Sequence, residues 1–221
     1  MTVGLVIVSH SVRLAEGVAE LAGQMAPGVA IRAAGGMEDG SLGTDFDRVL
    51  TALERADSGD GAVLLYDLGS ARMIADLVVE AHANPLHAVV VDAPVVEGAV
   101  AAAVAAQGGG DLAAVARAAG ERTPEFGEQA PPAAGESVEL VLRNEVGLHA
   151  RPAALLVRTI ASLKADVTVC HNGQQADARS VLALMGLSAR GGDTIKVVAD
   201  GPDAAEALRR ISKLVEIEFE E

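Results

Sequence analysis

The first half of the chain alternates between short, wholly apolar runs and longer segments whose apolar residues recur every three or four positions. The run VGLVIVS at residues 3–9 has the continuous apolar pattern of a strand buried on both faces of a parallel sheet. By contrast, Leu14, Val18 and Leu21 fall on one face of a helix over residues 12–25. The same patterns predict strands at residues 29–34, 61–67 and 87–93, and helices at 45–53, 70–82, 95–107 and 111–119, with Thr44 as the N-cap of the second helix. This order predicts an α/β doubly wound, mainly parallel sheet.

The second half follows a different pattern. Residues 137–144 alternate as a half-buried strand does, with Val138 and Leu140 on one face and Glu139 and Arg143 on the other. Further strands are predicted at residues 165–172, 174–179 and 193–200, with a hairpin turn at Asn172-Gly173, and helices at 150–163, 180–187 and 203–216, the last N-capped near Asp203. Since these strands follow one another without long crossovers, we expect an α+β antiparallel sheet that helices cover on one face.

A segment of different composition separates the two halves. Residues 121–136, ERTPEFGEQAPPAAGE, are rich in Pro, Gly, Glu and Ala and follow neither the strand nor the helix period. We therefore predict a first domain at residues 1–120, a linker at 121–136 and a second domain at 137–221.

Charge and cysteine content narrow the classes of partner. The formal net charge is −14, which disfavours binding to nucleic acid or to anionic lipid. The charge is uneven, because residues 1–120 carry 6 Arg and no Lys against 15 acidic residues, whereas residues 137–221 carry 10 basic and 12 acidic residues. No apolar run approaches the roughly 20 residues that span a bilayer, and the N-terminus lacks the basic region of a signal peptide, so we expect no membrane insertion. The single cysteine, Cys170, fits a reducing, cytoplasmic setting.

The stretch NEVGLHARPAA places His149 immediately before a predicted helix. A neutral imidazole is nucleophilic near pH 7, because its unperturbed pKa is about 6.5, and it can carry a phosphoryl group on a ring nitrogen. The helix start supplies free N–H groups and a positive dipole end, and Arg151 supplies a forked guanidinium for phosphate oxygens. Pro152 fits the first helical turn, and Gly147 allows the chain to turn before the site.

The full stretch GLHARPAA resembles the active-site motif of the histidine-containing phosphocarrier protein, HPr, of the bacterial phosphoenolpyruvate:sugar phosphotransferase system. The resemblance covers about residues 137–221 and includes the β-α-β-β-α-β-α order of elements. It implies an open-faced β-sandwich in which Enzyme I phosphorylates His149 and Arg151 stabilises the phosphoryl group. Ser180 falls where some HPr proteins carry a regulatory serine at a helix start, but we favour the alternative that it is only an N-cap.

A second histidine, His10, ends the first predicted strand, and ligands of open α/β sheets bind beyond the carboxyl ends of strands. Asp67 ends the third strand and would lie beside His10 if these strands are neighbours, so that its carboxylate holds one ring nitrogen and leaves the other nucleophilic. Gly69 and Ser70 begin the next helix and offer N–H groups to an oxyanion, and residues 35–44 would wall the site. The alternative is that His10 merely ends a strand and Asp67 merely caps a helix.

The stretches VIVSHS, GGMEDGSLGT and DLGSA resemble the mannose-family EIIA domains, and specifically the domain in the phosphoryl-donor subunit of phosphotransferase-dependent dihydroxyacetone kinase. That subunit joins the EIIA domain to an HPr domain, whereas sugar-transport relatives are more often joined to an EIIB domain. The resemblance implies a route from phosphoenolpyruvate through Enzyme I to His149, then His10, and then ADP bound to the nucleotide-binding subunit of the kinase, which phosphorylates dihydroxyacetone. It also implies a homodimer through the first domain. Some family members carry an Enzyme-I-like fragment; because this sequence ends at Glu221 without one, we expect a separate Enzyme I.

One alternative keeps the chemistry and changes the acceptor: a mannose-family sugar phosphotransferase component. Another belongs to a different class: a regulatory binding module whose phosphorylation state a partner reads, without catalytic turnover. A nucleotide-binding domain is disfavoured, because the residues after the first strand, SHSVRL, contain no Gly-x-Gly-x-x-Gly cradle. No cofactor is expected, since histidine is itself the carrier. No metal is expected either, because His82, His87 and His171 lie in no recognisable ligand spacing.

Overall fold

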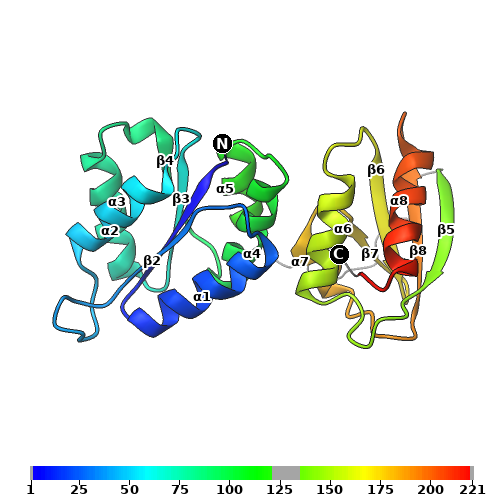
Figure 1. Cartoon of the computed structure of the whole chain (residues 1–221), viewed down its shortest axis with the longest axis horizontal. Helices are drawn as coiled ribbons and strands as arrows, with labels where there is room; N and C mark the ends of the chain where they lie inside the picture. Colours follow the sequence, from blue (N-terminus) through cyan, green and yellow to red (C-terminus); the bar gives the residue numbers. More distant parts are fainter. Residues whose placement is uncertain (1, 121–134, 220–221) are drawn as a thin grey trace. The chain divides into compact units, whose positions relative to one another are not determined.

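A computed structural model describes residues 2–120 and 135–219, and the contacts between residues divide the chain into two compact units, Met1–Arg122 and Thr123–Glu221 (Figure 1). The linker expected at residues 121–136 lies outside the described residues except for its last two positions. Of these, Glu136 is already the first residue of a strand, one position before the expected boundary.

The first unit is a parallel four-stranded sheet with helices on both faces (Figure 1). Its strands are β1 (Gly4–Ser9), β2 (Ile31–Gly35), β3 (Ala62–Tyr66) and β4 (Ala88–Val91), in the order β2-β1-β3-β4. Its helices are α1 (Val12–Met25), α2 (Phe46–Ala56), α3 (Gly69–Ala81), α4 (Val95–Gln107) and α5 (Leu112–Gly120), with the 3₁₀ turn η1 (Pro85–His87). The expected parallel sheet is confirmed, and β1 and β3 are adjacent.

Every residue of β1 is buried, which explains why Gly4–Val8 is an uninterrupted apolar run before Ser9. Successive side chains point to opposite faces: Leu5 and Ile7 pack with α1, α4 and α5, whereas Val6 and Val8 pack with α2 and α3. Burial of each such side chain contributes about 1.5–3 kcal/mol. The carboxyl end of β1 is therefore a rigid support for whatever follows it.

One N-cap prediction is wrong. The N-cap of α2 is Asp45, whose Oδ1 accepts a hydrogen bond from the Arg48 amide at 2.9 Å. Thr44 lies one residue earlier and forms a parallel bridge with Gly36. Both residue types cap helices well, but this bridge keeps Thr44 extended and leaves the capping position to its neighbour.

The second unit is an antiparallel sheet in the order β5-β8-β6-β7. Its elements are β5 (Glu136–Val141), α6 (Ala150–Ile160), β6 (Asp166–His171), β7 (Gln174–Asp177), α7 (Val181–Gly186), β8 (Thr194–Asp200) and α8 (Ala204–Glu216). In β8, Ile195 and Val197 are buried while Lys196 between them is exposed, so one face carries the core and the other is open. The hairpin turn has φ of 47° at Asn172 and 81° at Gly173, as a type I′ turn requires.

Two helix boundaries in this unit differ from expectation. Helix α6 ends at Ile160 rather than near residue 163, and the amide of Leu163 instead donates to the Ile160 carbonyl in a turn. Asp203 occupies the N-cap position of α8, but its Oδ2 accepts from the Lys164 amide at 2.7 Å rather than from its own helix. Within the described ranges, no helix is both long and apolar enough to cross a membrane.

Candidate functional site

His10 is the first residue after β1, at the carboxyl edge of the parallel sheet. The loop after β2 wraps around it: the Gly36 amide donates to the Ser9 carbonyl at 3.2 Å, and the Gly43 amide donates to the His10 carbonyl at 2.9 Å. Ser11 follows as the N-cap of α1 and accepts from the Leu14 amide. The backbone of His10 is thus held by residues 36 and 43 on one side and by the start of α1 on the other. The sequence predicts residues 35–44 as a wall of this site, and part of that loop lies against His10.

The Asp67 carboxylate, directly after β3, accepts four hydrogen bonds from groups in and beside His10. Its Oδ2 accepts from the Ser9 hydroxyl at 2.8 Å and from the His10 amide at 2.9 Å. Its Oδ1 lies 2.9 Å from His10 Nδ1 and accepts from the Leu68 amide at 2.7 Å. Burial raises the pKa of Asp67, but the hydrogen bonds from the His10 amide, the His10 ring and Ser9 outweigh burial and hold the pKa below its ordinary value. The carboxylate is therefore charged at neutral pH.

This charge decides which nitrogen of His10 is nucleophilic. A carboxylate only accepts hydrogen bonds, so the proton of a neutral imidazole lies on Nδ1, and Nε2 keeps its lone pair. The Ser70 Oγ lies 2.8 Å from Nε2 and donates its hydroxyl proton to it. The His10 side chain is 26% exposed, which leaves Nε2 open to a partner from solution.

The N-terminus of α3 faces the same nitrogen through Ser70. The amide groups of Gly69 and Ser70 have no hydrogen-bond partner among the described residues. A phosphoryl group on Nε2 would meet these donors and the positive end of the helix dipole. The structure thus brings together His10, Asp67, Gly69 and Ser70, the four residues that the sequence analysis proposed.

Sequence reasoning missed one member of this site, Ser9. Its hydroxyl donates to Asp67 and accepts from the Ser11 amide at 3.0 Å. Ser9 is fully buried, so its hydroxyl must find partners inside the protein. A serine within an otherwise apolar strand was the available signal.

His149 lies in the second unit, at the N-cap position of α6. Its backbone is extended, its side chain is exposed, and its ring forms no hydrogen bond with the described residues. The amides of Ala150 and Arg151 are the first of the helix and have no partner in the described structure. The Arg151 side chain is exposed and likewise unpaired within the described residues, so it is available for a phosphate, whereas Pro152 is buried in the first turn.

The backbone before His149 rests on residues 189–193. Gly147 has φ of +69°, and a Cβ there would lie 2.1 Å from the Ala189 carbonyl oxygen, so only glycine fits. The next amide, that of Leu148, donates to the same Ala189 carbonyl at 2.9 Å. Asn144 is buried and donates from Nδ2 to the Gly147 carbonyl at 2.8 Å. These contacts fix the direction from which His149 enters α6.

His171 supports residues 189–193 from the sheet, and the sequence analysis gave it no role. Its buried ring places Nδ1 3.1 Å from the Leu187 carbonyl oxygen and Nε2 3.1 Å from Asp193 Oδ2. The same Asp193 oxygen accepts from the Arg190 amide at 2.8 Å. The sequence around His171 does not indicate these contacts, because its partners follow α7 and meet the end of β6 only in the folded unit.

The remaining predicted residues take structural positions. Ser180 is the N-cap of α7, and its hydroxyl accepts from the Ala183 amide at 3.2 Å, as the N-cap interpretation requires. His82 Nδ1 lies 3.1 Å from the Asn84 carbonyl oxygen, and His87 lies 3.6 Å from Asp57.

Comparison with known proteins matches each unit to a family of phosphotransferase-system components. The model described as PTS system fructose IIA component matches residues 4–116, and the model described as PTS HPr component phosphorylation site matches residues 136–216. These matches confirm both resemblances found in the sequence.

Some of the similar relatives align with both units of this chain, and others align with about half of it or less. The phosphoryl donor subunit DhaM of the PEP-dependent dihydroxyacetone kinase of Escherichia coli (strain K12) is 35% identical over 99% of this chain and 51% of its own length. The phosphotransferase subunit DhaM of the PTS-dependent dihydroxyacetone kinase of Lactococcus lactis subsp. lactis (strain IL1403) is 40% identical over 52% of this chain and 91% of its own length. The phosphocarrier protein HPr of Xylella fastidiosa (strain 9a5c) is 37% identical over 38% of this chain and 93% of its own length. The chain spans about half the length of the curated relatives that it matches along both units.

Proposed function

We propose a function from the family to which this chain belongs. That family is the phosphoryl-donor subunits of dihydroxyacetone kinase. In this chain an EIIA domain of the phosphotransferase system is followed by an HPr domain. The chain relays a phosphoryl group. Enzyme I, charged by phosphoenolpyruvate, phosphorylates His149; the group then passes to His10, and from His10 to ADP on the nucleotide-binding subunit of the kinase. The kinase then phosphorylates dihydroxyacetone.

Entry of the phosphoryl group takes place at His149. A relay between proteins needs a nucleophile that a partner can approach, and the exposed ring of His149 meets this need. The unpaired amides at the start of α6 and the free Arg151 guanidinium supply donors for the phosphoryl oxygens. Because His149 is exposed among the described residues, an acceptor can approach a phosphoryl group that it carries.

Exit takes place at His10. The Nε2 lone pair attacks phosphorus, a new P–N bond forms, and the P–N bond to His149 breaks, returning the electron pair to the His149 ring. Positive charge that develops on the His10 imidazole is stabilised by Asp67, 2.9 Å from Nδ1. Ser70 and the first amides of α3 donate to the transferred oxygens. Transfer to ADP is the same displacement, with an oxygen of the terminal phosphate of ADP as the nucleophile.

The single observation that carries this proposal is the line Asp67–His10–Ser70. A carboxylate fixes one ring nitrogen at 2.9 Å, and a hydroxyl at a helix start addresses the other at 2.8 Å. A histidine that merely ends a strand needs neither partner. This arrangement orients a nucleophilic imidazole toward an anion.

The test is reconstitution of dihydroxyacetone phosphorylation from phosphoenolpyruvate, Enzyme I, this chain and the two other kinase subunits. We expect His10→Ala and His149→Ala each to abolish formation of dihydroxyacetone phosphate. Normal product formation with either variant would overturn the proposal, and labelling of the chain without transfer to ADP would instead favour a sugar-transport acceptor or a regulatory role.

A mixture of the two variants tests how the units cooperate. We propose that the first unit forms a homodimer, and the mixture decides whether phosphate passes within one chain or between chains. If His149 of one chain serves His10 of another, the mixture recovers activity, because each variant retains the histidine that the other lacks. Failure of the mixture at concentrations where the wild-type chain is active would restrict transfer to a single chain.

A further inference from the structure

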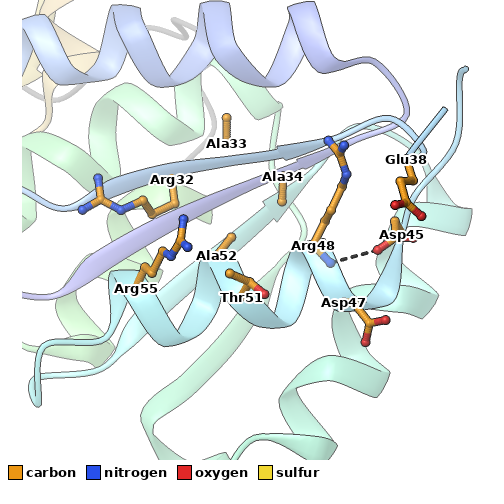
Figure 2. A pocket seen from close by; sticks show the side chains of 10 residues that line it. All are labelled: Arg32, Ala33, Ala34, Glu38, Asp45, Asp47, Arg48, Thr51, Ala52 and Arg55. Carbon is orange, nitrogen blue, oxygen red and sulfur yellow. Dashed lines mark hydrogen bonds between the residues drawn. The ribbon is translucent and has the colours of Figure 1, made fainter. Parts of the chain in front are cut away.

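A groove lies beside β2, at the edge of the sheet in the first unit, between that strand and α2 (Figure 2). Its volume is about 530 Å³. Its floor is made of small side chains, Ala33 and Ala34 from β2 and Ala52 from α2, so that the charged side chains around it decide what it binds. It shares no lining residue with the set that contacts the His10 ring.

Three arginines line this groove: Arg32 on β2, and Arg48 and Arg55 on α2. They are half of the six arginines in residues 1–120, where acidic residues number 15 and lysine is absent. None of the three forms an ion pair with a described residue. Arg32 donates to the Ile31 carbonyl at 3.2 Å and Arg48 to the Gly35 carbonyl at 3.4 Å, which leaves most of their N–H groups unused.

The concentration of unpaired guanidinium groups has a physical cost. Among the described residues of this unit, Arg72 forms an ion pair with Asp76 at 3.5 Å, at exposed positions of α3 and outside the groove. Arg32 and Arg55, which lie together at the end of the groove away from its carboxylates, repel one another unless an anion lies between them (Figure 2). Guanidinium is the side chain best matched to phosphate, because it donates two parallel hydrogen bonds.

The two ends of the groove differ in charge. In Figure 2, Arg32 and Arg55 lie together at one end, whereas Glu38, Asp45 and Asp47 gather at the other. The acidic end repels a ligand that is anionic along its whole length, such as an acidic peptide. Carboxylates do accept hydrogen bonds from hydroxyl groups. The complementary ligand therefore has phosphate at one end and hydroxyl groups at the other.

We propose that this groove binds a small phosphorylated, hydroxyl-rich metabolite of the sugar-phosphate class. The phosphate lies between Arg32 and Arg55, and the hydroxyl groups bind the carboxylates at the opposite end. Thr51, which also lines the groove, supplies a hydroxyl between the two ends.

Calorimetric titration of the full chain with glucose 6-phosphate, glucose and inorganic phosphate as probes tests the proposal. We expect glucose 6-phosphate to bind at least 10-fold more tightly than inorganic phosphate, and glucose not to bind at millimolar concentration. Arg55→Gln should weaken binding of glucose 6-phosphate at least 10-fold. The matched control is Arg117→Gln, which removes the same charge at an exposed position of α5 in the same unit and should leave the Kd within twofold.

Asp47→Asn separates the two ends of the groove. It should bring the affinity for glucose 6-phosphate close to that for inorganic phosphate, without weakening the latter. Equal losses in Arg55→Gln and Arg117→Gln would show attraction by net charge alone and overturn the proposal. So would equal affinity for inorganic phosphate and glucose 6-phosphate, binding of a poly-glutamate peptide in preference to both, or no binding of any probe. Equal thermal melting of the variants excludes misfolding as the cause.

Discussion

Replacing Asp67 by asparagine removes the charge that faces the His10 ring and preserves the size of the side chain. The carboxylate accepts four hydrogen bonds, from the Ser9 hydroxyl, the His10 amide, the His10 ring and the Leu68 amide, at 2.7–2.9 Å. An amide side chain has one acceptor oxygen and one NH₂ group. In one orientation its NH₂ faces the His10 amide donor; in the other it faces Nδ1 and favours the tautomer that protonates Nε2, the proposed nucleophile.

The magnitude follows from these contacts. A hydrogen bond to a charged group contributes about 1.5–3 kcal/mol net, so two lost bonds amount to about 3–6 kcal/mol. The Asp67 side chain is 11% exposed, and water at this edge offsets part of that loss. We therefore expect a barrier about 2–4 kcal/mol higher, which corresponds to transfer about 30- to 1,000-fold slower.

The assay isolates this step. A chain with His10→Ala, labelled with phosphate at His149, is the donor, and a chain with His149→Ala is the acceptor, with or without Asp67→Asn. Rapid-quench sampling follows the label onto His10. Asp76→Asn is the control, because it makes the same change at an exposed position of α3. Transfer to the Asp67→Asn acceptor at the unmodified rate, with the fold intact, would refute the orienting role of this carboxylate.

Three further outcomes follow from the same contacts. Ser70→Ala should slow transfer to His10 about 5- to 10-fold in the same assay, since one neutral hydrogen bond of about 1 kcal/mol is lost; an unchanged rate would exclude Ser70 from the phosphoryl site. Gly147→Ala should lower the free energy of unfolding of the second unit by more than about 2 kcal/mol in denaturant unfolding, because it adds a backbone clash to the strain of positive φ. Gly173→Ala, at positive φ in open space, should lower it by only about 1 kcal/mol. Equal costs would contradict this account. Because folding lowers the pKa of Asp67, this carboxylate stabilises the first unit at pH values above its pKa in the unfolded chain, and the stabilisation is lost as the pH falls through the lower pKa of the folded state. The stability of Asp67→Asn should therefore fall less on acidification than that of the wild-type chain. Identical profiles of stability against pH would contradict this role of Asp67.

The sequence predicted the elements well because their patterns are set by local burial. The uniform apolar run of β1 and the Asn172-Gly173 turn each have one structural solution, and the structure contains both. The juxtaposition of His10 and Asp67 was predicted as well, since parallel strands bring their carboxyl ends to one edge once β1 and β3 are neighbours.

Contacts between distant residues that no strand or helix pattern brings together were not predictable. The role of His171 depends on Asp193 and the Leu187 carbonyl, which come from other elements. The choice of Asp45 over Thr44 as N-cap depends on a bridge to Gly36, eight residues away. The arginine groove likewise joins β2 to α2, and no single segment shows it.

The relay itself is tested most directly by mapping acid-labile label after incubation with labelled phosphoenolpyruvate and Enzyme I. The account predicts label on both histidines of the wild-type chain, on His149 alone after His10→Ala, and on neither histidine after His149→Ala. Label on His10 in the His149→Ala chain would contradict the account, because His10 would then receive phosphate without passing through the HPr domain.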